Sequence, residues 1–89
     1  MILVIMQEKI ISKTILAIAK ERGPEKTTCP SEIARRLFLV DWRKHMAIVK
    51  EVAISLREHG KILITQKGVA IETDEIKGPI RIKINDAQQ

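Results

Sequence analysis

The first regular pattern of hydrophobic positions predicts an amphipathic helix over about residues 7–22. Gly23 and Pro24 favour its end, because glycine suits the left-handed residue after a helix and proline does not continue one. Residues 1–6, MILVIM, are apolar throughout and fit either an extension of the helix or a short strand. Apolar residues spaced by three and four form one stripe along the helix: Ile11, Ile15, Ile18 and Ala19.

Residues 27–38 predict a short extended segment and then a second helix. Thr27 and Thr28 are β-branched and suit an extended backbone. Pro30 is favoured in the first turn of a helix, where its missing N–H is no loss, so Cys29 falls at or next to the N-cap. The predicted apolar face consists of Ile33, Ala34, Leu37 and Phe38.

A third helix is predicted from Trp42 to His59, with Asp41 as its N-cap and Gly60 just beyond it. One broad arc of this helix is expected to face the core: Trp42, His45, Met46, Ile48, Val49, Val52, Ala53 and Leu56. Five residues spaced by four and three form a ridge on the opposite side: Arg43, Ala47, Lys50, Ile54 and Arg57.

After Gly60 the pattern changes to that of strands. KILITQKG predicts a strand that ends in a turn at Lys67–Gly68, and GPIRIKIN alternates so that its isoleucines share one face. VAIETDEIK is expected to extend the hairpin briefly and then to become a loop, and the tail, residues 85–89, to fray. This order of elements predicts one α+β domain over residues 1–89, a winged helix-turn-helix with a C-terminal β-hairpin wing. Residues 1–6 and 85–89 are expected to be peripheral.

Composition narrows the class of protein. The chain has 89 residues with one Trp, one Phe and no Tyr, so aliphatic side chains must build a small core. A single cysteine forms no internal disulfide, and no apolar run approaches the ~20 residues of a membrane span. We therefore expect a cytoplasmic protein that does not contact membranes.

The net charge of +5 fits a polyanionic partner, and it also fits simple solubility. In a helix-turn-helix the second helix enters the DNA major groove, which would place the ridge of the third helix against bases and phosphates. Glu51 and Glu58 favour the alternative that these charges are only solvated. The residues predicted to bind nucleic acid, most plausibly duplex DNA, are Arg35, Arg36, Arg43, Lys44, Ala47, Lys50, Arg57 and Lys67.

The sequence gives little support for catalysis, cofactor binding or metal binding. A glycine-rich phosphate loop and a plausible carboxylate pair are both missing from the sequence, so we expect no enzyme and no cofactor. Cys29, His45 and His59 lack the spacing of paired metal ligands, so no metal is expected. Cys29 as a thiol sensor remains an alternative, as does a protein-interaction module or homodimer that uses Ile10, Leu16, Ile54 and residues 1–6. Trp42 is expected to anchor the turn before the third helix.

Four motifs occur in order: TTCPSEIARRL, DWRKHM, ITQKG and KGPIRIKI. Over about residues 15–84 the chain resembles a family of short bacterial proteins of unknown function. The resemblance implies a winged-helix-like fold and no particular activity. Residues 1–6 and the long VAIETDEIKG segment look like departures from the family pattern.

Overall fold

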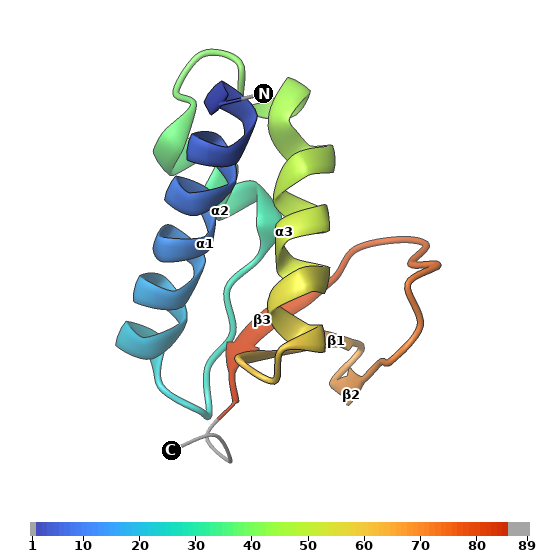
Figure 1. The fold of residues 1–89 in the computed structure, drawn as a ribbon. Helices are drawn as coiled ribbons and strands as arrows, with labels where there is room; N and C mark the ends of the chain where they lie inside the picture. Colours follow the sequence, from blue (N-terminus) through green and yellow to red (C-terminus); the bar gives the residue numbers. More distant parts are fainter. Residues whose placement is uncertain (1, 86–89) are drawn as a thin grey trace.

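The computed structural model describes residues 2–85, and in the first helix the side chains from Met6 onward. The predicted fraying of the tail concerns residues that lie almost entirely outside this range. Three α-helices and a three-stranded antiparallel sheet make the protein α+β, as expected (Figure 1). The order is α1 (Ile2–Arg22), α2 (Pro30–Leu37), the 3₁₀ helix η1 (Trp42–His45), α3 (Met46–Glu58), β1 (Ile62–Gln66), β2 (Val69–Ala70) and β3 (Arg81–Ile84).

Helix α1 begins earlier than the predicted helix, because residues 2–6 extend it and do not form a strand. Its predicted stripe is buried along its whole length. Gly23 ends the helix with φ of 80°, and its N–H donates to the carbonyl oxygens of Ala19 and Lys20 at 3.1 and 3.2 Å. The left-handed stop predicted from glycine and proline is therefore confirmed.

The predicted third helix is two elements, since residues 42–45 form η1 and α3 begins at Met46. Asp41 does not cap with its side chain; its carbonyl oxygen instead accepts from the N–H of Lys44 at 2.9 Å. A 3₁₀ helix turns about 20° more per residue than an α-helix. Arg43 is therefore rotated by roughly 60° from the ridge on which a continuous α-helix would place it with Ala47 and Lys50.

The sheet has the strand order β2-β1-β3, so β1 lies between the other two. The register pairs Ile62 with Ile84 and Ile64 with Ile82, and all four side chains are buried. On the other side of β3, Thr28 and Ile82 exchange two backbone hydrogen bonds of 2.7 Å. The short extended segment predicted before α2 is thus a single bridge to β3. The isoleucine face of the sheet closes the helical cluster, which packs through α1, α2 and α3 (Figure 1).

A two-residue turn joins β1 to β2 at the predicted position. Lys67 and Gly68 have φ of 51° and 82°, as a type I′ turn requires at both central residues. β2 is only two residues long, and residues 71–80 form a loop that extends beside α3 before the chain returns as β3 (Figure 1). This arrangement is compatible with a winged-helix-like fold.

Within residues 2–85, no helix combines the length and the apolar character that crossing a bilayer requires.

Candidate nucleic-acid interface

The N-terminal half of α3 leaves two predicted residues open to solvent. Ala47 is exposed and Lys50 is half-buried, and Lys44, in the preceding η1, is exposed as well. A small side chain at position 47 leaves room for another molecule to approach the helix backbone here. This half of the ridge is therefore available to a partner.

The C-terminal half of the same ridge is less open, and residues 71–74 of the long loop lie against its end at Arg57. Ile54, which the sequence placed on the surface, is partly buried and packs against the core, as do Ile71 and Ile76 of the loop. Its expected exposure was wrong, because its side chain packs against the core cluster.

Arg57 lies under this loop, and only 6% of its side chain is exposed. Its Nη1 donates to the carbonyl oxygen of Thr73 at 2.9 Å, and its Nη2 pairs with the carboxylate of Asp74. A guanidinium whose donors are used in this way has little left to offer a phosphate. Arg57 therefore holds the loop against α3, and we leave it out of the candidate interface.

The first hollow beside the exposed half of α3 is a cavity of about 210 Å³. Helix α3 contributes Met46 and Lys50 to it. The opposite walls come from the start of α2 and the end of the long loop: Cys29, Pro30, Ser31, Gly78, Pro79 and Ile80. Lys50 is the charged group in this lining, and the thiol of Cys29 lies 3.1 Å from the hydroxyl oxygen of Ser31.

The second hollow, of about 630 Å³, lies between the β1–β2 turn and the end of the long loop. Three cations line it: Lys67, Lys77 and Arg81. Gln66 fixes its shape, because the side-chain amide donates to the carbonyl oxygens of Lys77 at 2.6 Å and Pro79 at 3.2 Å.

The sequence predicted Lys67 as an interface residue but did not predict Lys77 or Arg81. Arg81 could be placed on the outward face of its strand, but its neighbours could not be inferred from alternation. Lys77 lies in an irregular loop and carries no periodic signal. Only the fold brings the two residues to Lys67.

Gly78 and Pro79 line both hollows and so form a shared wall between them. The hollow that Lys50 lines therefore adjoins the hollow that the three cations line. No carboxylate appears among the described residues that line either one. We call Lys50, Lys67, Lys77 and Arg81 the basic surface.

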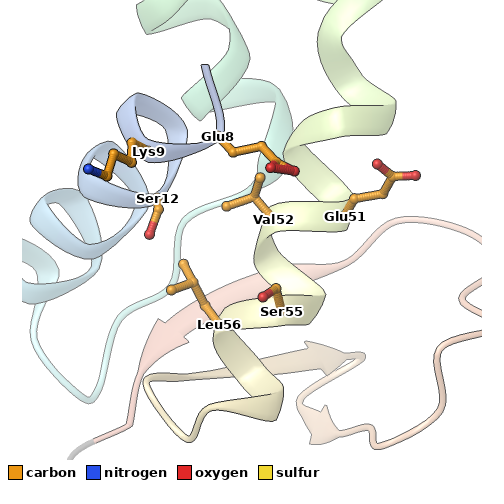
Figure 2. A pocket seen from close by; sticks show the side chains of 7 residues that line it. All are labelled: Glu8, Lys9, Ser12, Glu51, Val52, Ser55 and Leu56. Carbon is orange, nitrogen blue, oxygen red and sulfur yellow. The ribbon is translucent and has the colours of Figure 1, made fainter. Parts of the chain in front are cut away.

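Glu51, which the sequence suggested would weaken the positive field of α3, lies in a different place from Lys50. It lines a groove of about 280 Å³ between α1 and α3, with Glu8 on the α1 side (Figure 2). Val52 and Leu56 supply apolar walls to this groove, and Ser12 and Ser55 supply hydroxyl groups (Figure 2). Glu51 therefore does not line either hollow of the basic surface.

Trp42 carries a second group of cations, at the end of α2 and in η1. The guanidinium carbons of Arg35 and Arg43 each lie 4.4 Å from the centroid of its ring. The indole is half-buried and packs against the core, as an anchor of this turn would. The ring therefore has two functions in the structure, since it joins the core and gathers two arginines.

Arg36 is exposed and lies one turn after Glu32 in α2. Glu32 pairs with Arg22 of α1 and accepts from the hydroxyl of Thr28 at 2.7 Å. These hydrogen bonds, that from Arg22 first, hold the pKa of Glu32 below its usual range, and the charge of Arg36 adds to the effect. The carboxylate of Glu32 conversely raises the pKa of Arg22. This network fastens α1 to the start of α2.

The side chains considered as metal ligands lie apart. Among residues 2–85 no three His, Cys, Asp or Glu side chains gather where they could hold a metal ion. His45 stacks on Phe38 with ring centroids 3.7 Å apart, and its Nδ1–H donates to the carbonyl oxygen of Asp41. His59 likewise donates from Nδ1 to the carbonyl oxygen of Ser55 at 2.8 Å.

Three helices closed by a small antiparallel sheet, with cations on the side of the long loop, define a small α+β domain that is compatible with a winged-helix-like fold. Residues 8–85 match the sequence pattern of a family described as "Protein of unknown function (DUF3253)", and the chain belongs to that family. The match agrees with the resemblance to a family of unknown function that the four motifs suggested. No curated protein matches the chain in sequence.

Proposed function

We propose that this protein is a winged helix-turn-helix that binds nucleic acid, with duplex DNA as its target. The observation that carries the proposal is the basic surface, which consists of two adjoining hollows, one lined by Lys50 of α3 and the other by Lys67, Lys77 and Arg81. In this assignment α2 and α3 are the helix-turn-helix, and the β1–β2 turn with the long loop is the wing.

The assignment gives each part of the surface a different contact. Lys44 and Ala47, on the open part of η1 and α3, face base edges in the major groove, as the first turns of a recognition helix do. Lys50 and the cations of the second hollow contact phosphates, which fix the position of the protein without reading sequence.

Such an interface provides about four phosphate contacts, so we expect a dissociation constant on the order of 10⁻⁴ to 10⁻⁶ M for random duplex at physiological salt. The logarithm of the binding constant should fall against the logarithm of salt concentration with a slope of about −3 to −4.

Fluorescence anisotropy with a labelled random duplex, measured at several salt concentrations, tests the proposal. Lys50→Glu should weaken binding by about tenfold or more, because it reverses the charge of the cation that lines the first hollow. Lys13→Glu is a matched control, since Lys13 is exposed on α1 and the change in net charge is the same. Circular dichroism confirms that both variants fold. Failure of the unaltered protein to bind at low salt, or equal losses in both variants, would overturn the proposal.

A protein-interaction module of the same fold is the second candidate. Leu39 and Val40, in the turn before η1, are 84% and 91% exposed, and Met6 and Ile10 are exposed on α1. Leu16 and Ile54, also expected in such a surface, are partly buried against the core and contribute less. Sedimentation of the purified chain checks for a homodimer. A monomer–dimer equilibrium that Leu39→Ser with Val40→Ser abolishes, without DNA binding, would favour this candidate.

A further inference from the structure

Arg35, Trp42 and Arg43 form a cluster that the proposed recognition surface does not explain. Arg35 comes from the last turn of α2, whereas Trp42 and Arg43 belong to η1. Both arginines are exposed, and neither has a carboxylate within ion-pair distance in the described part of the chain.

The arrangement concentrates positive charge. Each guanidinium carbon lies 4.4 Å from the same ring centroid, so the two can be no further apart than twice that distance. Attraction to the indole face is worth about 0.5–1 kcal/mol at an exposed site, and it holds together two groups that repel each other. The described residues supply no carboxylate that pairs with either arginine, and this favours an anion as the partner of the cluster.

A phosphate group fits this position by its chemistry. The planar guanidinium donates two parallel hydrogen bonds of about 2.7–2.9 Å to phosphate oxygens, and a phosphate has enough oxygens to accept from two arginines. Because Trp42 packs on the core, it holds both groups in place before a ligand arrives. Less side-chain entropy is then lost on binding than for two free arginines.

We propose that Arg35 and Arg43 form a phosphate clamp, with Trp42 as the residue that positions them, and that the clamp takes one backbone phosphate of the nucleic acid. The assignment of this phosphate to a nucleic acid rests on the proposed function. Arg43 precedes Lys50 by three 3₁₀ steps and four α-helical steps, a rise of roughly 12 Å, so the clamp and Lys50 contact different phosphates.

Trp42 is the only tryptophan of the chain, so its fluorescence reports directly on the clamp. Titration with a random duplex labelled for anisotropy should change Trp42 emission in parallel with the anisotropy. Arg35→Gln and Arg43→Gln should each weaken binding several-fold and reduce the magnitude of the salt slope by about one. Lys13→Gln, which removes one distant charge, should leave the slope within error.

Variants at position 42 distinguish the role of Trp42 in positioning the two arginines from its role in packing against the core. Trp42→Leu removes no charge yet should weaken DNA binding, whereas Trp42→Phe keeps an aromatic face and should recover most of the affinity. Circular dichroism checks both folds, and the arginine variants carry the test if Trp42→Leu does not fold.

The outcomes for the clamp and for the proposed function are distinguishable. DNA binding with unchanged Trp42 emission and unchanged salt slopes in both arginine variants would overturn the clamp and leave the proposed function standing. If DNA does not bind, the source of the phosphate is wrong, and pyrophosphate then tests the clamp alone. A change of Trp42 emission that Arg35→Gln and Arg43→Gln abolish would support the clamp, and no change would overturn it.

Discussion

Replacing Arg57 with methionine should destabilise the protein without weakening nucleic-acid binding. Methionine retains an apolar stem of similar length but removes the guanidinium that holds residues 71–74 against α3. The hydrogen bond to Thr73 contributes about 1 kcal/mol. The pair with Asp74 contributes less than a buried pair, because 62% of the Asp74 side chain is exposed and solvent screens the interaction.

The hydrogen bond from Arg57 to the carbonyl oxygen of Ile71 spans 3.5 Å and adds little. Together these interactions amount to about 2 kcal/mol. For a domain of 60–100 residues, 1 kcal/mol corresponds to about 4–8 °C in the melting temperature, so we expect Arg57→Met to melt about 10 °C lower.

Thermal unfolding followed by circular dichroism measures this shift, with urea unfolding as a second measure of the free energy. Arg36→Met is the control, because Arg36 is exposed on α2 and its loss should change the stability by less than about 0.5 kcal/mol. Anisotropy at a temperature where both variants are folded should give Arg57→Met an unchanged affinity for duplex DNA. Equal melting temperatures for the two variants, or a large loss of affinity in Arg57→Met alone, would refute the assignment of Arg57 to the loop.

Three further predictions follow from the structure. Ile64→Ala in the buried centre of β1 should cost about 2–5 kcal/mol in urea unfolding, and a cost below 1 kcal/mol would contradict the packing. Gly68→Ala should cost about 1–2 kcal/mol, since φ of 82° strains any residue with a Cβ; an unchanged urea midpoint would exclude that turn conformation. Glu32→Gln should cost about 1 kcal/mol at pH 7. Because the folded pKa of Glu32 is lowered, its contribution is complete above the unfolded value of about 4.3 and is lost as pH falls through the folded pKa. The stability difference between Glu32→Gln and the unaltered chain should therefore vanish in acid, and a difference that persists at pH 2 would count against the network.

The parts of the fold that follow from local pattern could be predicted from the sequence. The buried stripe of α1 and the alternating isoleucines of β3 depend on spacings of 3.6 and 2 residues, which are visible in the chain itself. The turn at Lys67 and Gly68 has a local cause as well, because glycine tolerates positive φ.

The parts that depend on distant segments could not be predicted. Helical periodicity placed Ile54 and Arg57 at the surface, and it contains no information on the core contacts of Ile54 or on a loop that returns over Arg57. The spacing of apolar residues likewise did not predict that residues 42–45 form a 3₁₀ helix. In the structure this segment coincides with the contacts of Trp42 with two arginines and of His45 with Phe38.

Strand β3 has a consequence for how the protein is made. Its isoleucines complete the core, it pairs with β1 over four residues, and it bridges back to Thr28 near the start of α2. Ribosomes add about 5–20 residues per second, and the segments that β3 joins are synthesised well before it. A nascent chain that has not yet emerged as far as Ile84 thus presents unprotected isoleucines, and the core is completed only once β3 is available to pair with β1.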